Sequence, residues 1–413
     1  MNSQIVLIKD SLGSRVTFIL LTSIIAISIF LKAGFISVSV IWFFTLCIYN
    51  YKGPIKHQLK TYKLLLFPIG LFVLYLLWLL LSTDPVAAVD IVVRKIHLLL
   101  IPLGFIIADR KITEKDLHII LLTFLIACLL CSFVCIICVL YNIILTGSLV
   151  SGGQEYYFLS DLLTDVVNIS PVYFSMYCNL ALLITLYTPF IKRPPYRIGI
   201  VSYLGVFIIL CTARIGIIAM CVIFLVWLLH SHYGKNLFYA FVLALCAVAA
   251  FVSSYVFLNK DQVPSMFKFS YTDQYGNHTA NQLLIWSSAM EAIKKNPLTG
   301  YGTGDGQKDF EEIYEKNEPI PEQGDPLNPH NEFFSATLDL GIAGGCLLIA
   351  TLIIPFIRSI LMKDPMALGF IVIIAFFFCV ESVLIRQKGI VFFSFFYSLL
   401  HAHQANVKLD SKN

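Results

Sequence analysis

Residues 328–331 read Asn-Pro-His-Asn and place a proton acceptor at the end of a long polar stretch. That stretch covers 259–329 between apolar segments, and His330 opens the next apolar segment. Imidazole is the side chain that most readily exchanges a proton near neutral pH. Because Asn328 is a plausible N-cap and Pro329 suits a helix start, we expect His330 in the first helical turn, where the helix dipole favours the neutral ring that a general base requires. The alternative is an interfacial histidine bonded to a loop carbonyl.

Two arginines stand at the ends of apolar segments, where a charge is costly and is usually functional or paired. A guanidinium group binds phosphate or diphosphate through two parallel hydrogen bonds, so Arg214 is a candidate ligand for a phosphorylated substrate. The alternative for Arg214 is a structural ion pair, for example with Glu381. Glu381 and Arg386 share the sequence Glu-Ser-Val-Leu-Ile-Arg, and they either serve a substrate or form a salt bridge that joins two helix ends.

Other polar groups favour structure over chemistry. Arg94 lies with Lys95 and His97 near the end of an apolar segment, as a snorkelling anchor or as part of an anionic site. The polar loops contain no Asp-x-Asp pair and no cluster with metal-ligand spacing, so the sequence predicts no metal and no cofactor. Four cysteines on one face of an apolar segment indicate helix packing rather than a metal site; they are Cys128, Cys131, Cys135 and Cys138.

The composition identifies the elements that must hold these residues. Of 413 residues, 58% are hydrophobic and 13% are charged, which is about half the charged fraction of an ordinary soluble domain. Unbroken apolar segments indicate an all-α polytopic membrane protein, whereas an outer-membrane barrel shows short alternating segments. The formal net charge of +4 is too small to indicate nucleic-acid binding, and the first apolar segment lacks a signal-peptide cleavage site.

A membrane-spanning helix needs about 20 apolar residues. The stretch 198–230 is too long for one such helix and short for two, and we divide it at Thr212-Ala213-Arg214 because basic loops flank both of its ends. The sequence then predicts about twelve spans, at 16–31, 35–49, 64–82, 91–108, 117–145, 169–190, 198–212, 215–230, 237–258, 331–357, 366–384 and 389–403.

The distribution of basic residues sets the orientation, because cytoplasmic loops carry an excess of lysine and arginine. With twelve spans both termini are cytoplasmic and the loop 259–329 lies on the outer side, where Arg214, His330 and Arg386 also meet. The basic loops that assign the cytoplasmic side contain Lys52, Lys56, Lys60, Lys63, Arg110, Lys111, Lys115, Lys192, Arg193, Arg197, Lys235, Arg358 and Lys363.

The loop 259–329 contains two short helical patterns. An apolar-periodic piece runs from 283 to 293 and ends at Asn296-Pro297, and a second piece lies at 310–314. The four glycines in 300–306 match neither of the common phosphate-binding glycine motifs, so this segment is interpreted as a tight turn. We expect two short amphipathic helices joined by a glycine turn, resting on the membrane surface.

Several short motifs follow one another in the segment 198–357. They are Thr212-Ala213-Arg214-Ile215-Gly216, Ile285-Trp286, Asn296-Pro297-Leu298-Thr299-Gly300-Tyr301-Gly302, His330-Asn331-Glu332-Phe333-Phe334 and Asp339-Leu340-Gly341-Ile342-Ala343-Gly344. In their order and spacing they resemble the O-antigen ligase and polymerase superfamily, which includes related bacterial O-oligosaccharyltransferases. The resemblance divides the chain into N-terminal helices at 1–197, a ligase-like core at 198–357, and C-terminal helices with a cytoplasmic tail at 358–413.

The resemblance implies a metal-independent, inverting glycosyltransferase of GT-C-like helical architecture in the bacterial inner membrane, with a periplasmic active site. Its donor would be a glycan on undecaprenyl diphosphate, and its acceptor a sugar hydroxyl of the lipid A–core or of another glycan. Membrane lipid would surround it, and nucleic acid is not expected as a partner. By the same resemblance His330 activates the acceptor hydroxyl and Arg214 contacts the donor diphosphate.

One position departs from the family pattern. Family members often carry an arginine just before the tryptophan that corresponds to Trp286, whereas this chain has Asn281 and Gln282 there. The diphosphate site would then need another cation. Substitutes and supporting residues are expected among Arg386, Arg94, Lys95, Asn331, Glu381 and Trp286 itself.

Three other functions remain open from the sequence. Ligases and polymerases share these motifs, so a polymerase that joins O-antigen repeat units is the nearest alternative. A transporter or flippase is more remote, because transporters place ionisable residues at the membrane midplane in two related halves, which this chain lacks. A scaffold protein is the third alternative, and intolerance of substitution at His330 would argue against it.

Overall fold

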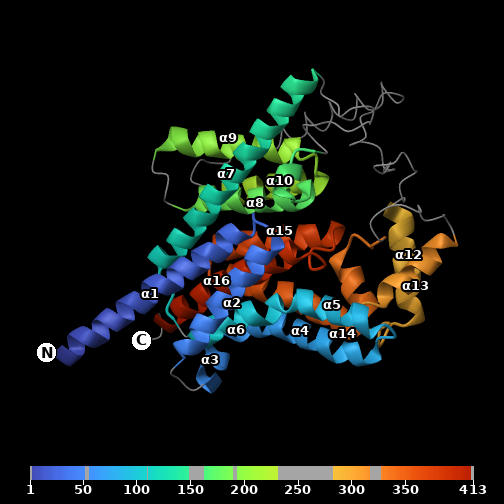
Figure 1. The fold of residues 1–413 in the computed structure, drawn as a ribbon, viewed down its shortest axis with the longest axis horizontal. Coiled ribbons are helices and arrows are strands. Elements are labelled where there is room, and N and C mark those ends of the chain that lie inside the picture. The colour runs from blue at the N-terminus through green and yellow to red at the C-terminus, as the bar shows by residue number, and fades with distance from the viewer. Residues whose placement is uncertain are drawn as a thin grey trace.

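The computed structural model describes residues 2–51, 55–108, 110–147, 162–188, 193–230, 282–316 and 327–410, and in these ranges the chain forms helices and no strand (Figure 1). Short 3₁₀ helices are η1 (Lys63–Leu65), η2 (Leu79–Leu81) and η3 (Asp165–Val167). The α-helices are α1 (Asn2–Ser28), α2 (Ala33–Tyr49), α3 (Ile55–Thr61), α4 (Leu66–Trp78), α5 (Pro85–Lys95), α6 (His97–Ala108), α7 (Glu114–Thr146), α8 (Pro171–Tyr187), α9 (Pro194–Leu210), α10 (Arg214–His230), α12 (Gln282–Lys295), α13 (Gly306–Glu315), α14 (Glu332–Leu361), α15 (Pro365–Val380) and α16 (Gln387–Asp410).

The helices follow the apolar segments of the sequence. Every predicted span within the described residues coincides with a helix or with consecutive helices, and the predicted span 237–258 lies outside the described residues. Within the part of the chain that the structure describes, four helical stretches could cross a membrane by length and composition: Lys63–Leu81, Pro85–Ala108, Glu114–Thr146 and Glu332–Leu361. Six more apolar helices in these ranges are 10–17 residues long. The fold is therefore an all-helical membrane protein, as the sequence predicts.

The division of the stretch 198–230 is confirmed. Helix α9 ends at Leu210 and α10 begins at Arg214. Between them Thr212 adopts a left-handed backbone with φ of 52°, which a continuous α-helix does not contain. Arg214 consequently stands at the N-terminal end of a helix instead of in the middle of one.

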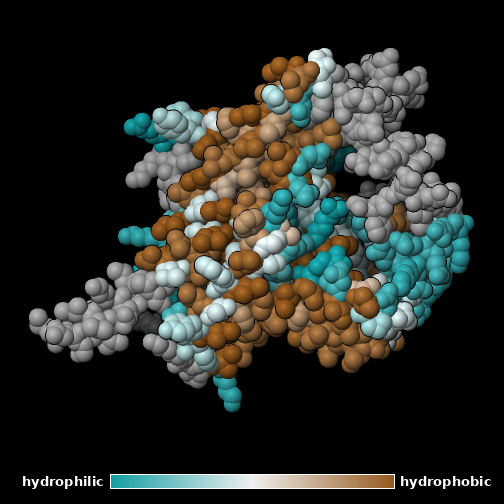
Figure 2. Space-filling view, in the orientation of Figure 1, coloured by the Kyte–Doolittle hydropathy of each residue, from teal (hydrophilic) through white to brown (hydrophobic). Residues whose placement is uncertain are grey.

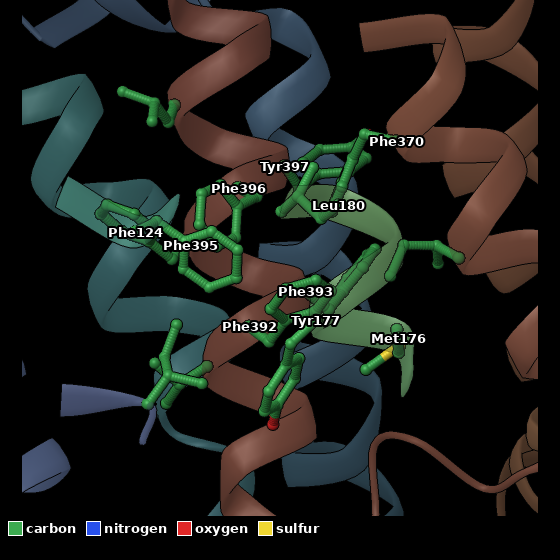
Figure 3. Close-up of a cluster of buried hydrophobic side chains, with 14 of the residues drawn as sticks. Phe124, Met176, Tyr177, Leu180, Phe370, Phe392, Phe393, Phe395, Phe396 and Tyr397 are labelled. Atoms are coloured by element: carbon green, nitrogen blue, oxygen red, sulfur yellow. The ribbon is translucent and has the colours of Figure 1, made fainter. Parts of the chain in front are cut away.

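Two helices form the centre of the bundle. Helix α16 is buried from Gly389 to Asn406, and α8 is buried from Tyr173 to Leu186. A helix that is apolar on every side is covered on every side by other helices. Figure 3 shows how aromatic rings from α16 pack against α8 and their neighbours, for example Phe392 on Tyr177 with ring centroids 4.7 Å apart and Phe396 on Phe124 at 4.7 Å.

The outer helices expose apolar side chains. Large hydrophobic residues on α1, α2, α4, α7, α9 and α14 are more than one-third exposed. In a soluble protein such a surface would be an aggregation hazard, whereas here it is suited to lipid. Figure 2 shows brown, hydrophobic surface over most of this face, a hydrophilic band near its middle, and hydrophilic residues at the α12–α13 end.

The glycine turn between α12 and α13 is inserted into a break in α14. Gly341 has φ of 64° and ψ of −162°, so Ile342 cannot donate its N–H to the carbonyl of Leu338 four residues earlier. The Ile342 N–H donates to the Pro297 carbonyl at 2.9 Å instead, and the Leu338 carbonyl accepts from the Tyr301 N–H at 2.9 Å. The backbone groups freed by the break are thus paired with the turn.

The same turn is attached to the end of α4 and the start of α5. The Trp78 indole N–H donates to the Thr299 carbonyl at 2.6 Å, and the Thr303 hydroxyl donates to the Tyr75 carbonyl at 2.7 Å. Asp84, the N-cap of α5, accepts from the Ala87 N–H and lies 3.3 Å from the Lys308 ammonium, and these two partners hold the pKa of its carboxyl below the ordinary value.

The two predicted loop helices are confirmed, and their packing differs from the expectation. Helices α12 and α13 pack on each other and on α14 around a separate small core; its buried members are Ile285, Ala289, Ala292, Phe310, Ile313, Tyr314 and Leu338. The sequence predicts helices that rest on the membrane surface, but their apolar faces are covered by protein. This α12–α13 unit is therefore a small lobe fixed to the first half of α14.

Replacing Gly341 by alanine should destabilise the fold strongly. A Cβ atom at this position would lie 2.2 Å from the Leu298 carbonyl oxygen, and the backbone conformation is one that non-glycine residues adopt at a cost of about 1–3 kcal/mol before any clash. We expect a fall of several degrees in the midpoint of thermal unfolding in detergent. Gly199→Ala is the matched control, because nothing lies within 4 Å of a Cβ there, and it should leave the midpoint unchanged or higher. An equal effect of both changes would contradict the role of the break.

Candidate functional site

His330 lies immediately before α14, and the expected helix start is wrong by three residues. Helix α14 begins at Glu332, and its N-cap is Asn331, whose side-chain oxygen accepts from the N–H groups of Phe333 at 2.9 Å and Phe334 at 3.1 Å. The side chain of Asn328 accepts from the N–H of His330 at 2.8 Å and so forms a local turn.

His330 therefore lies outside the first helical turn, and the helix-dipole argument for its neutral ring does not apply. Its φ is 45°, a left-handed conformation in which non-glycine residues are uncommon. Backbone strain of this kind is frequent where a side chain must be aimed at a target. The His330 side chain is 44% exposed, so the ring remains open to a partner molecule.

The imidazole of His330 faces a carboxylate. The Glu381 Oε2 atom lies 3.5 Å from His330 Nδ1, and the Glu381 side chain is 16% exposed. The other carboxylate oxygen of Glu381 accepts from the N–H of Ser382 at 3.1 Å, which limits its rotation. A carboxylate at Nδ1 favours the tautomer that carries its proton on Nδ1, and this tautomer leaves Nε2 able to accept a proton. The structure thus forms a His330–Glu381 pair between residues that are well separated in sequence.

Asn331 fixes the geometry of this pair. Its backbone N–H donates to the Ser382 hydroxyl at 3.2 Å, and its side-chain amide donates to the Cys379 carbonyl at 2.9 Å. The Ser382 hydroxyl also lies 2.8 Å from that of Ser335 on α14. The end of α15 is consequently joined to the start of α14, and these are the two segments that carry Glu381 and His330.

Two buried charges hold the segment 381–386, which we call the α15–α16 connection. Glu332 is fully buried and its Oε2 atom accepts from the Leu384 N–H at 2.7 Å. Lys95 is 4% exposed, its ammonium donates to the Leu384 carbonyl at 2.8 Å, and it lies 4.1 Å above the Tyr75 ring. The Glu332 carboxylate thus binds the backbone N–H of Leu384 and the Lys95 ammonium binds its carbonyl. The two side chains also attract each other electrostatically.

Removing either buried charge should destabilise the α15–α16 connection. Lys95→Met leaves the Glu332 carboxylate buried without its counter-charge, and Glu332→Gln takes from the Lys95 ammonium the stronger of its two carboxylate partners and leaves Asp339; breaking a buried pair from one side costs about 3–5 kcal/mol. The double variant should lose less than the sum of the single losses by about 0.5–3 kcal/mol. Unfolding of the four proteins in detergent measures this coupling, and strictly additive losses would show that the two charges act independently.

Arg214 is held close to α8. It is the first residue of α10 and is exposed, while two residues later the Gly216 carbonyl accepts from the Asn179 side chain of α8 at 3.0 Å. A Cβ atom at Gly216 would lie 2.5 Å from the Ser175 hydroxyl, so glycine is needed for this approach. The first turn of α10 thus packs on the first half of α8.

Helix α8 in turn reaches the α15–α16 connection. The hydroxyl of Tyr173, in its first turn, donates to the Ser382 carbonyl at 3.2 Å. The start of α8, the start of α10, the start of α14 and the end of α15 therefore lie at one end of the bundle. Arg214 and the His330–Glu381 pair are at this same end, and Arg386 is an exposed residue of the connection itself.

The other predicted residues have the following places. Arg94 forms an ion pair with Asp90 on the same helix at 2.9 Å, on the exposed side of α5. Trp286 of α12 packs edge-on against Phe334 of α14, with ring centroids 6.2 Å apart, and belongs to the core of the α12–α13 unit. Asn281 lies outside the described residues. Among the described residues, no group of three or more His, Cys, Asp or Glu side chains is placed to hold a metal ion.

The hydrogen bonds that join Glu332 and Lys95 to the backbone of Leu384 were not predicted from the sequence. In the sequence analysis Glu332 is one residue of a motif, and Lys95 is a snorkelling anchor, part of an anionic site or a substitute cation for the diphosphate; the structure instead buries Lys95 against the Leu384 carbonyl. The available signal is that each is an ionisable residue within a few residues of an apolar segment, where an unpaired charge is expensive. Their common partner is a backbone residue, and nothing in the sequence marks Leu384 for that role.

Comparisons with known proteins point to one family. A family model described as O-antigen ligase matches residues 199–349, the segment that contains Arg214, Trp286, the glycine turn, His330 and the break in α14 at Gly341. No curated protein matches the chain. The match begins one residue after the start of the segment 198–357 expected from the motifs and ends eight residues before its end. Residues 199–349 are therefore similar to the O-antigen ligase family, as the motifs suggest.

Proposed function

We propose that the protein is an O-antigen ligase-like glycosyltransferase that moves a glycan from undecaprenyl diphosphate to a sugar hydroxyl of the lipid A–core. The observation that carries this proposal is the His330–Glu381 pair, at 3.5 Å, at the same end of the bundle as Arg214 and inside the matched segment. A base and a guanidinium at the same end of a helical membrane bundle suit a substrate with a lipid tail, a diphosphate and a reacting sugar.

In the proposed reaction the acceptor oxygen attacks the anomeric carbon of the donor from the side opposite the diphosphate. The new carbon–oxygen bond forms as the bond to the diphosphate breaks, and this displacement inverts the anomeric centre. The acceptor proton passes to Nε2 of His330, and the departing diphosphate keeps the bonding electron pair. Arg214 and Arg386 would neutralise its growing charge, the task that a metal ion performs in other transferases.

Glu381 has the role of an orienting partner. It accepts a hydrogen bond from the Nδ1–H group of His330, fixes the ring, and stabilises the imidazolium that forms when Nε2 takes up a proton. The carboxylate does not itself take the proton, so its contribution is positional and electrostatic. Asn331 supports the pair by joining α14 to the end of α15.

The proposal includes a topology of about twelve spans in a GT-C-like arrangement, with both termini in the cytoplasm of the cell and the site on the periplasmic side of the inner membrane. The donor lipid then lies along the apolar outer helices, and its diphosphate meets Arg214 at the periplasmic boundary. The core segment 198–357 supplies the reacting groups, and the segments 1–197 and 358–413 supply the helices that hold them.

Analysis of lipopolysaccharide from a deletion strain tests the proposal. Loss of a ligase leaves long polymer on the lipid carrier and a bare lipid A–core on the gel. Loss of a polymerase, the nearest alternative in the same superfamily, leaves core with a single repeat unit. A normal ladder in the deletion strain, with no change in any lipid-linked glycan, would contradict both functions.

A further inference from the structure

We propose that a cavity at the opposite end of the bundle binds the phosphate headgroup of an anionic phospholipid from the cytoplasmic leaflet. The cavity has a volume of about 410 Å³ and lies where α1, α6 and α7 meet. Among the described residues, three basic ones line it, namely Arg15, Arg110 and Lys111, together with one carboxylate, Asp116. These described side chains carry a net positive charge.

Hydrogen bonds within the protein hold the residues that line the cavity in place. Asp116 holds Arg15 through both carboxylate oxygens, each 2.9 Å from Arg15 Nη2. The Thr113 N–H donates to Asp116 at 3.0 Å, so the carboxylate is already satisfied by the protein. The Arg110 carbonyl accepts from the Asn406 amide of α16 at 3.4 Å. The guanidinium of Arg15 and the Arg110–Lys111 loop are thus held in place before any ligand arrives, which lowers the entropic cost of binding.

The apolar part of the lining identifies a lipid rather than a soluble anion. Phe18 and Ile19 line the cavity next to Arg15. Toward the middle of the bundle, Leu20 on α1 and Ile119 on α7 are exposed at 57% and 49%. A cationic cavity with apolar side chains in its lining, formed by helices that also expose apolar side chains, matches a phosphate that is attached to acyl chains.

The position of the cavity relative to the proposed active site indicates which membrane leaflet the cavity faces. Helix α16 begins at Gln387, whose amide lies 3.2 Å from His97 Nε2 near the active-site end, and Asn406 touches the cavity loop. At 1.5 Å per residue these two points are roughly 29 Å apart, about the thickness of a hydrocarbon core. The cavity and His330 are therefore on opposite sides of the membrane. The basic loops of the sequence assign the cavity side to the cytoplasm.

The test uses the full-length protein purified in detergent, with lipid binding measured by native mass spectrometry and by the shift in the unfolding midpoint. The probes are phosphatidylglycerol, phosphatidylcholine and inorganic phosphate. The variant is Arg110→Ala/Lys111→Ala. Its matched control is Lys56→Ala/Lys60→Ala on α3, which removes the same charge from the same predicted side and lies outside the cavity.

We expect phosphatidylglycerol to bind the wild-type protein and the α3 control alike, and to bind the cavity variant roughly thirtyfold more weakly. Equal binding by all three proteins would overturn the site. An equal loss of phosphatidylglycerol binding in the α3 control would show that basic loops attract anionic lipid in general and that the cavity is not a specific site. Equal stabilisation by phosphatidylcholine or by inorganic phosphate would overturn the assignment of an anionic lipid. None of these outcomes depends on whether the protein transfers glycans.

Discussion

Replacing His330 by asparagine should reduce glycan transfer by roughly 10²–10⁴-fold, the range for loss of a positioned general base. Asparagine is the better test residue than alanine, because it tolerates the left-handed backbone found at position 330, where φ is 45°. It keeps the fold while removing the ring nitrogen that would accept the acceptor proton. His330→Ala should be equally inactive. The measurement is the rate at which purified protein moves glycan from the lipid carrier to the acceptor.

The variant Glu381→Gln distinguishes the orienting role of Glu381 from the proton transfer to His330. A glutamine keeps a polar group beside His330 but removes the negative charge that stabilises the imidazolium, so the rate should fall less than in the His330 variants. His57→Ala on the exposed helix α3 is a matched control and should transfer normally. Transfer near the wild-type rate in His330→Asn, with normal protein levels, would remove the imidazole from the mechanism.

Replacing Arg214 by lysine should lower the rate of transfer by about 10²–10³-fold, although the charge is kept. A guanidinium presents two parallel N–H groups to a diphosphate, whereas an ammonium is a single point charge on a flexible stem. Removing one preorganised donor to a developing negative charge typically costs about this much. Arg214→Ala should lose at least as much. The rate under saturating donor and the concentration of donor for half-maximal rate should both be measured.

The exposed position of Arg214 at the start of α10 makes it a site where substitution leaves the packing intact. Arg193→Lys, at the N-cap of α9, is a matched control because Arg193 is exposed and lies at the far end of the preceding helix. Its transfer rate should be unchanged. If Arg214→Lys transfers at the wild-type rate, a bidentate contact to the donor is not required, and the cation of the site lies elsewhere.

The long apolar helices could be predicted from the sequence because each is an apolar segment bounded by polar residues or glycine, whereas the short polar helix α3 lies in a segment expected to be a basic loop. The break at Thr212 was predictable for a similar reason, since 198–230 fits neither one span nor two ideal ones. The α12 and α13 helices followed from their apolar periodicity. Hydropathy did not reveal what covers an amphipathic face, so these two helices were expected on the membrane surface and lie on α14 instead.

The start of α14 was predicted wrongly because two asparagines compete for the same role. Asn328 and Asn331 each precede a residue that could open a helix, and Pro329 favours the first of them. In the structure Asn331 reaches the free N–H groups of the helix, while Asn328 forms a turn around His330. Only the three-dimensional position of the α15–α16 connection, which also binds Asn331, decides between the two.

The contacts between the site residues could not be predicted from the sequence. The residue types at His330, Arg214 and Glu381 suggested chemistry, but the His330–Glu381 contact depends on how α14 and α15 pack. The hydrogen bonds from Glu332 and Lys95 to Leu384 involve its backbone atoms, which every residue possesses. Interactions of this kind carry no compositional signal, and a single sequence does not reveal them.

The attachment of the α12–α13 unit has a consequence for how such proteins diversify. The glycine turn is joined to α14 through main-chain groups, at Pro297, Tyr301, Leu338 and Ile342. Main-chain bonds place few demands on the side chains that point away from them. The water-facing surface of this lobe can therefore change, by selection or by engineering, while the lobe keeps its attachment to α14.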